Sequence, residues 1–125
     1  MQYEEIMQAT VIRAADLRAN QDERWKYLYH VPNGGNRDPR VGARLKGQGV
    51  RRGVPDLCLP IPRPAVSGFA AYHGLYLELK AKGNDLTPEQ EQWLSFLGQQ
   101  GYCVGTIRDE PLEVIAAIEW YLDYE

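Results

Sequence analysis

The chain has 125 residues, 44% of them hydrophobic, which suits a single compact domain covering residues 1–125. Its net charge is −3, it has only two cysteines, and its apolar runs are far shorter than the roughly 20 residues that cross a bilayer. These features argue against a membrane protein, a disulfide-stabilised scaffold and a disordered chain. They indicate a protein of the reducing cytoplasm, without contact to a membrane.

The first predicted element is a helix over residues 4–18, because apolar residues recur there at spacings of three and four. Glu4 lies on the same stripe as Met7 and Val11, which is an unusual place for a carboxylate. It is either a first-turn acid favoured by the helix dipole or a functional group that points into a cleft. Residues 25–31 alternate loosely and predict a strand, which ends in a turn over residues 33–36.

Asp38 and Pro39 predict the start of a second helix, with the acid as cap and the proline in the first turn. This helix is expected to end near Lys46, before a glycine-rich break over residues 47–49. Residues 56–60 then predict a short apolar strand. Residues 61–74 are rich in proline and small side chains, and they predict a surface loop.

Residues 75–80 alternate cleanly, so Glu78 and Lys80 are expected on one face of a strand and three leucines on the other. Thr87 and Gln90 form a capping-box pattern that opens a helix ending near residues 98–101, and residues 102–107 predict another strand. A last helix begins near Pro111, with these residues expected to be buried: Leu112, Ile115, Ala116, Ile118 and Leu122. The order of elements predicts an α/β domain with a mixed central sheet flanked by helices.

Basic residues gather in one segment of this acidic chain. Residues 37–52 carry a net charge of +5 against −3 for the whole chain, from six bases and one acid. The six are Arg37, Arg40, Arg44, Lys46, Arg51 and Arg52. Such a segment is either a positive patch for phosphates or simply a solvated face.

Most enzyme templates are absent, including a P-loop, a dinucleotide fingerprint and a nucleophile elbow. What remains is Asp56 at the start of one strand, with Glu78 and Lys80 two residues apart on the next. Two carboxylates beside an amine suit a hard cation such as Mg²⁺, which activates water and neutralises phosphate charge. The alternative is a pair of solvated side chains on an exposed strand.

Three segments carry a resemblance to a known family: residues 50–56 (VRRGVPD), 74–80 (GLYLELK) and 86–94 (LTPEQEQWL). Together they resemble the VRR-NUC domain of the PD-(D/E)XK nucleases, and the resemblance covers residues 4–107. It implies a restriction-endonuclease-like core and a divalent-metal-dependent nuclease.

The resemblance also implies roles for single residues. Asp56 and Glu78 would bind the metal together with the Leu79 backbone carbonyl, and Lys80 would be the catalytic lysine. Gln90 would be a further active-site residue, although the capping box alone also explains a glutamine there.

The family's first-helix acid precedes a glutamine by four residues, which fits Glu4 with Gln8. Glu5 lies three residues before Gln8 and is the alternative.

Stand-alone members of this family resemble Holliday-junction resolvases and tend to be homodimers. The expected function is therefore a Mg²⁺- or Mn²⁺-dependent endonuclease that cuts branched DNA at four-way junctions, without an organic cofactor. The alternatives are a flap or nicking nuclease that acts with a replication or packaging partner, and a catalytically silent DNA-binding module. The small size of the chain is typical of a bacterial or phage protein, so the expected location is the cytoplasm of a bacterial or phage-infected cell.

Overall fold

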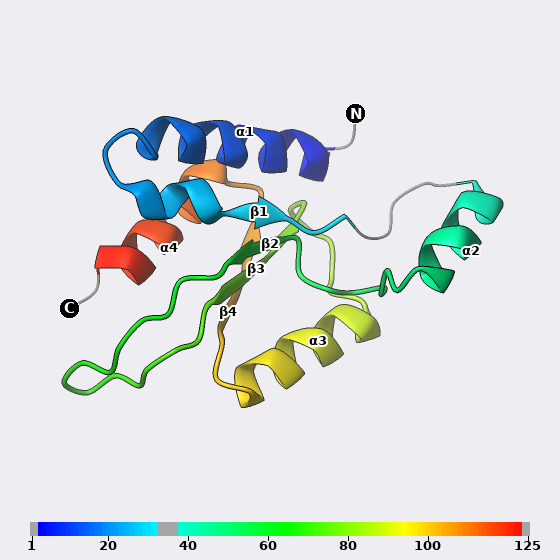
Figure 1. Ribbon diagram of the computed structural model, residues 1–125. Coiled ribbons are helices and arrows are strands. Elements are labelled where there is room, and N and C mark those ends of the chain that lie inside the picture. The colour runs from blue at the N-terminus through cyan, green and yellow to red at the C-terminus, as the bar shows by residue number, and fades with distance from the viewer. Residues whose placement is uncertain (1–2, 33–37, 124–125) are drawn as a thin grey trace.

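The computed structural model describes residues 3–32 and 38–123, so the predicted turn over residues 33–36 lies outside the described part. Helices and strands alternate along the chain as expected for an α/β domain (Figure 1). None of the described helices is both long and apolar enough to cross a membrane. The elements are α1 (Tyr3–Arg18), a 3-10 helix η1 (Glu23–Tyr27), β1 (Tyr29–His30), α2 (Pro39–Gly47), β2 (Leu57–Leu59), β3 (Leu75–Lys80), α3 (Pro88–Gln99), β4 (Cys103–Arg108) and α4 (Pro111–Asp123).

The four strands form one mixed sheet in the order β1-β2-β3-β4. β1 pairs with β2 and β2 with β3 in antiparallel fashion, whereas β3 and β4 run parallel. The α3 helix supplies the crossover that a parallel pair requires. The predicted fold class, a mixed central sheet flanked by helices, is confirmed.

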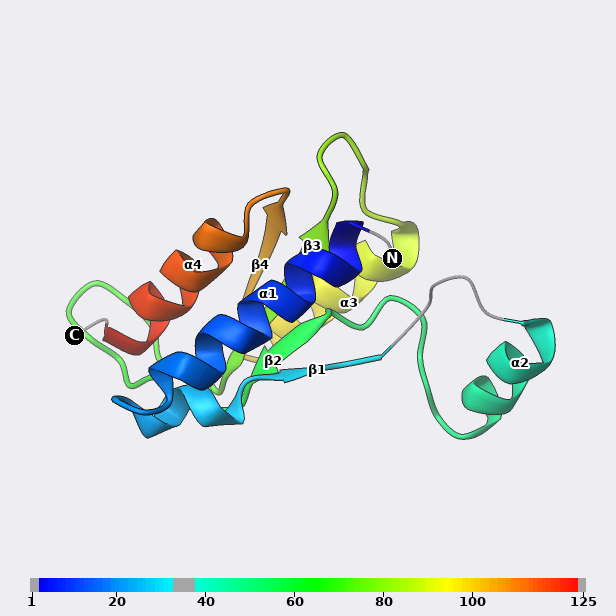
Figure 2. The ribbon, with the colours of Figure 1, turned by 90° about the horizontal axis from the view of Figure 1, so that it is seen from above.

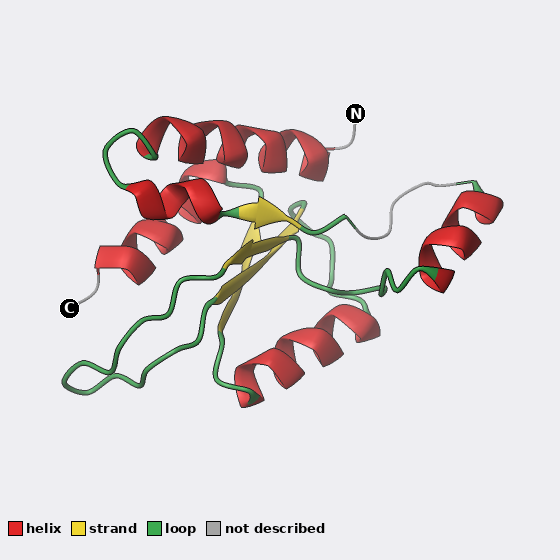
Figure 3. Ribbon diagram, viewed as in Figure 1, coloured by secondary structure: helices red, strands yellow, loops and turns green. Residues whose placement is uncertain are grey.

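Helices cover both faces of this sheet. α1 and α4 lie on one face and α3 on the other (Figures 1 and 3). Val11 of α1, Ile118 of α4 and Leu77 of β3 belong to the same buried cluster. The leucine face of β3 therefore points to α1 and α4, and its other face points to α3.

The α2 helix stands apart from this core. It extends to one side of the molecule (Figure 2), and none of its residues is buried. Its predicted start is confirmed, because the Asp38 carboxylate accepts a hydrogen bond from the Arg40 backbone N–H at 2.8 Å. α2 is thus held by its cap and its connections rather than by packing.

The strand predicted over residues 25–31 is wrong in its first half. Residues 23–27 form η1, and the Asp22 carboxylate caps it by accepting a hydrogen bond from the Arg24 N–H. Trp25 and Leu28 are both buried. Their spacing of three residues matches the period of a 3-10 helix, and strand geometry is left only to Tyr29 and His30.

The buried side of α4 also differs from the prediction. Ile115, Ile118 and Leu122 are buried as expected, but Leu112 is 75% exposed and Ala116 is exposed too. Val114 and Tyr121 take their places in the core. The helix is therefore rotated from the expected orientation: Val114 belongs to the core cluster, and Tyr121 packs against Tyr72 of the loop over residues 61–74.

That loop is attached to α4. Arg63 and Tyr72 pair across it, and the Tyr121 hydroxyl donates a hydrogen bond to the Ile61 carbonyl oxygen at 2.7 Å. Arg63 is buried, with its guanidinium carbon 4.6 Å from the centre of the Trp120 ring. The prediction of a surface loop holds for most of the segment but is wrong for Arg63 and Gly74, which are buried.

Candidate active site

The face of β3 that points to α3 carries Glu78 and Lys80. As predicted, both project from the face opposite the three leucines. They are less accessible than a cleft position suggests, since Glu78 is 2% and Lys80 8% exposed. The first turn of α3 covers them, and Gln90 is the residue of that turn that contacts both.

Gln90 has two sets of hydrogen bonds. Its side-chain oxygen accepts from the Thr87 N–H at 2.8 Å, which completes the predicted capping box. The same oxygen accepts from Lys80 Nζ at 3.3 Å, and the amide nitrogen donates to Glu78 Oε1 at 3.1 Å. The two interpretations of Gln90 are therefore compatible, because one side chain both caps α3 and holds Glu78 and Lys80 in position.

Asp56 joins this cluster from the segment before β2. Its Oδ2 accepts a hydrogen bond from the Leu79 backbone N–H at 2.8 Å. Burial raises the pKa of the Asp56 carboxyl, although the Leu79 N–H opposes this shift. Burial and the nearby Asp56 carboxylate together raise the pKa of Glu78 to about 9. Such a pair of close, desolvated carboxyls with shifted pKa values is typical of functional sites.

Glu4 reaches the same end of β3 from the first turn of α1. Its Oε2 accepts a hydrogen bond from the Ala81 backbone N–H at 3.1 Å, one residue beyond Lys80. The charge of Glu4 also contributes to the raised pKa values of Asp56 and Glu78. Glu5, by contrast, is exposed. Of the two candidate acids, Glu4 is thus the one that lies in the cluster.

The donor set suits a small hard cation. Glu78 Oε2 is buried and accepts no hydrogen bond from an N–H group of the described residues, and the carboxyl shares a hydrogen bond with the neighbouring Asp56. Among residues 3–32 and 38–123, no group of three or more His, Cys, Asp or Glu side chains is arranged to hold a metal ion by itself. Mg²⁺ uses one or two carboxylates plus water and substrate oxygens, and Asp56 with Glu78 meets that requirement.

Two residues near the cluster make contacts that the sequence analysis does not predict. His30 Nδ1 lies 3.1 Å from the Asp56 carbonyl oxygen, which is a consequence of the pairing of β1 with β2. Gly53 has a φ of +91°, and a Cβ there would lie 2.6 Å from the Glu89 carbonyl carbon. Only glycine fits this close approach, which joins the segment before Asp56 to the start of α3. The contact of His30 follows from the pairing of β1 with β2, and the contact of Gly53 follows from the packing of its segment against α3.

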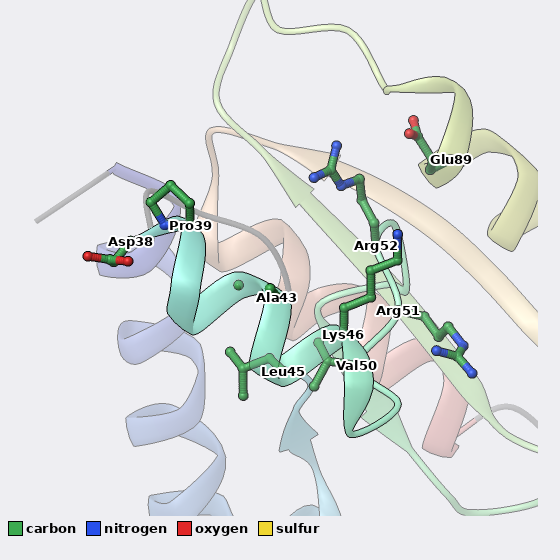
Figure 4. A pocket seen from close by; sticks show the side chains of 10 residues that line it. Asp38, Pro39, Ala43, Leu45, Lys46, Val50, Arg51, Arg52 and Glu89 are labelled. Carbon is green, nitrogen blue, oxygen red and sulfur yellow. The ribbon is translucent and has the colours of Figure 1, made fainter.

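Three of the predicted basic residues line a groove and two do not. Lys46, Arg51 and Arg52 line a groove of about 630 Å³ between α2, the loop after it and Glu89 of α3 (Figure 4). Arg40 and Arg44 are exposed on α2 but do not line the groove. Arg37 lies outside the described residues. Binding of DNA by these residues stays a prediction.

An acid–lysine cluster on a mixed α/β sheet is the arrangement of nucleases with a restriction-endonuclease-like core. The family model of the VRR-NUC domain matches residues 8–109, so the chain belongs to this family. A solved structure described as a VRR_NUC domain protein is similar, with a TM-score of 0.73 and 29% sequence identity over 98% of this chain and 90% of that chain. A comparison with curated proteins gives no match. Family membership implies a nuclease-type function with DNA as substrate.

Proposed function

We propose that this protein is a divalent-metal-dependent endonuclease that hydrolyses phosphodiester bonds in branched DNA, with four-way junctions as a substrate. The buried Glu78 carboxylate carries this proposal, because its Oε2 accepts no hydrogen bond from an N–H group of the described residues and Asp56 lies beside it. Two adjacent buried carboxyls are costly to ionise, and a bound divalent metal would offset that cost, as the proton shared by Glu78 and Asp56 does in the metal-free protein.

Asp56, Glu78 and the Leu79 carbonyl would hold Mg²⁺ or Mn²⁺. When bound, such an ion lowers the pKa of a water molecule and neutralises charge on the scissile phosphate. Lys80 places its Nζ beside the carboxylates, where it can orient the attacking water and stabilise the charge that develops on the phosphate. Gln90 holds the Lys80 ammonium and the Glu78 carboxylate in a fixed relation. Glu4 adds a further negative charge at the end of β3.

We further propose that the protein acts as a homodimer. A four-way junction is cut on two strands, and a two-fold symmetric enzyme supplies two equivalent sites. Phosphates would be held by the basic residues of α2 and the loop that follows it, since such contacts position DNA without reading its sequence.

The direct test is a cleavage assay on labelled four-way junction, flap, single-stranded and linear duplex DNA, with Mg²⁺, Mn²⁺ or EDTA. We expect cleavage of the junction only with a divalent metal, and none by Asp56→Asn. Asp85→Asn is the matched control, because Asp85 is exposed in the loop before α3. Cleavage in EDTA, or full activity of Asp56→Asn, would refute the metal assignment. Light scattering with and without DNA tests the dimer.

Glu4→Gln is expected to lower the cleavage rate by roughly 10–100-fold, the usual effect of removing a group that supports a metal site. Its Oε2 bonds to the Ala81 N–H, and its charge acts on both carboxyls of the cluster. Glu5→Gln, the matched control one residue away, should change the rate by less than about twofold. Rates at saturating Mn²⁺ decide between them, and a larger loss in Glu5→Gln would make Glu5 the first-helix acid.

A further inference from the structure

The groove beside α2 is lined by basic and apolar side chains, and by the two acids Asp38 and Glu89. Lys46, Arg51 and Arg52 supply positive charge, whereas Ala43, Leu45 and Val50 supply an apolar surface. In Figure 4, Lys46 and Arg52 extend in the same direction while Arg51 points the other way. A single strand of nucleic acid has complementary properties, because its phosphates are negatively charged and its bases have flat apolar faces.

The groove opens next to the acid cluster. Gly53 packs against the Glu89 backbone, and Glu89 lines the groove. The next residue, Gln90, bonds to Glu78 and Lys80. In the segment between α2 and β2, Arg52 precedes Asp56 by only four residues. A chain of nucleotides that leaves the cluster therefore reaches the groove within a short distance.

The size of the groove selects what can occupy it. A volume of about 630 Å³ lies in the range of sites for small molecules, about 300–1,000 Å³. This space admits about one or two nucleotides and excludes base-paired DNA, whose bases are turned inwards. The three basic side chains outnumber the two acids, Asp38 and Glu89, and this excess of positive charge favours a polyanion over an apolar peptide.

We propose that this groove binds unpaired nucleotides adjoining the scissile phosphate. The preferred substrate class is then DNA in which a single-stranded segment leaves a duplex at the point of cleavage, as in a flap, a splayed arm or an opened junction. This inference rests on the nuclease function proposed for the cluster, but the binding that it requires is independent of metal and of cleavage.

Two glycines of α2 provide a matched test. A Cβ at Gly42 or at Gly47 would meet no atom within 4 Å, so the local structure accepts a larger side chain at both positions. Gly42 lines the groove and Gly47 does not. Gly42→Phe should therefore fill the groove, whereas Gly47→Phe makes the same change outside it.

Binding is measured by fluorescence anisotropy in EDTA with a splayed-arm DNA and a blunt duplex that shares its paired sequence. We expect the native protein to bind the splayed arm about tenfold more tightly than the duplex. Gly42→Phe should lose this difference and Gly47→Phe should keep it. Equal affinity of the native protein for both DNAs, or an unchanged preference in Gly42→Phe, would overturn the inference.

A second pair of variants, with milder substitutions, tests the groove even if Gly42→Phe does not fold. Lys46→Gln and Arg44→Gln each remove one positive charge from α2, but only Lys46 lines the groove. Lys46→Gln should weaken the splayed arm more than the duplex, and Arg44→Gln should weaken both equally. Equal weakening by Lys46→Gln would overturn the inference. So would a change in oligomeric state confined to Gly42→Phe, because the groove would then hold a second copy of the chain.

Different results would refute the proposed binding groove and the proposed nuclease function. A preference for the splayed arm in EDTA without cleavage in Mn²⁺ would refute the nuclease function and leave the groove as a binding site. Cleavage in Mn²⁺ without that preference would support the nuclease and refute the groove.

Discussion

Lys80→Met is expected to lower the rate of DNA cleavage by about 10²–10⁴-fold, the usual contribution of a positioned proton-transfer or charge-stabilising group. Lys80 is 8% exposed, and its Nζ lies 3.3 Å from Gln90 Oε1 beside the carboxylates. Methionine matches the length of the buried stem and removes the charge, whereas alanine would leave a cavity. The low exposure of Lys80 contradicts the alternative of a solvated side chain on an exposed strand.

The matched control is Lys82→Met, because Lys82 is exposed in the turn that follows β3. It should retain cleavage and melt at a similar temperature. Single-turnover rates at saturating Mn²⁺, with DNA affinity measured separately, isolate the chemical step. If Lys80→Met still cleaves at the native rate, Lys80 has no role in catalysis.

Local signals predicted most of what positions the cluster. The alternation over residues 75–80 fixes which side chains share a face, since successive residues of a strand point to opposite sides. The Thr87–Gln90 pattern fixes the start of α3, since it satisfies backbone N–H groups within one turn. Both features depend on residues close in the chain, so one sequence suffices to predict them.

The features of the site that the sequence does not predict depend on its three-dimensional packing. Glu78 and Lys80 are buried because α3 folds over the strand, which the alternation of β3 cannot reveal. Lys46 lines the groove together with Glu89 of α3, whereas Arg40 and Arg44 do not, and the positive charges of one short helix do not reveal this difference. Contacts between segments far apart in the sequence determine both outcomes.

The buried acid pair has a consequence for stability that the strand pattern does not predict. Burial first, and repulsion from Asp56 second, raise the pKa of Glu78 from 4.5 to about 9. Between these values the folded protein binds a proton that the unfolded chain releases. The free energy of unfolding of the metal-free protein should therefore fall as the pH rises through this window. Divalent metal should reverse this loss, because it binds the ionised pair.

Glu78→Gln is accordingly expected to abolish cleavage and to stabilise the metal-free protein. An amide occupies the same space, keeps an oxygen for the Gln90 N–H and offers Asp56 a donor without the proton uptake that Glu78 requires on folding. We expect the free energy of unfolding at about pH 8 to rise by on the order of 1–3 kcal/mol, with a weaker dependence on pH than in the native protein.

Urea unfolding in EDTA at several pH values between about 5 and 9 measures this change, and repeating the series with Mg²⁺ shows whether stabilisation by the metal is lost. Glu91→Gln is the control, because Glu91 lies exposed one residue after Gln90 and should shift stability by less than about 1 kcal/mol. Active-site groups are often held at a cost to the fold. A less stable Glu78→Gln protein, or one with the native pH dependence, would contradict the raised pKa of Glu78 and remove its support for the proposed metal site.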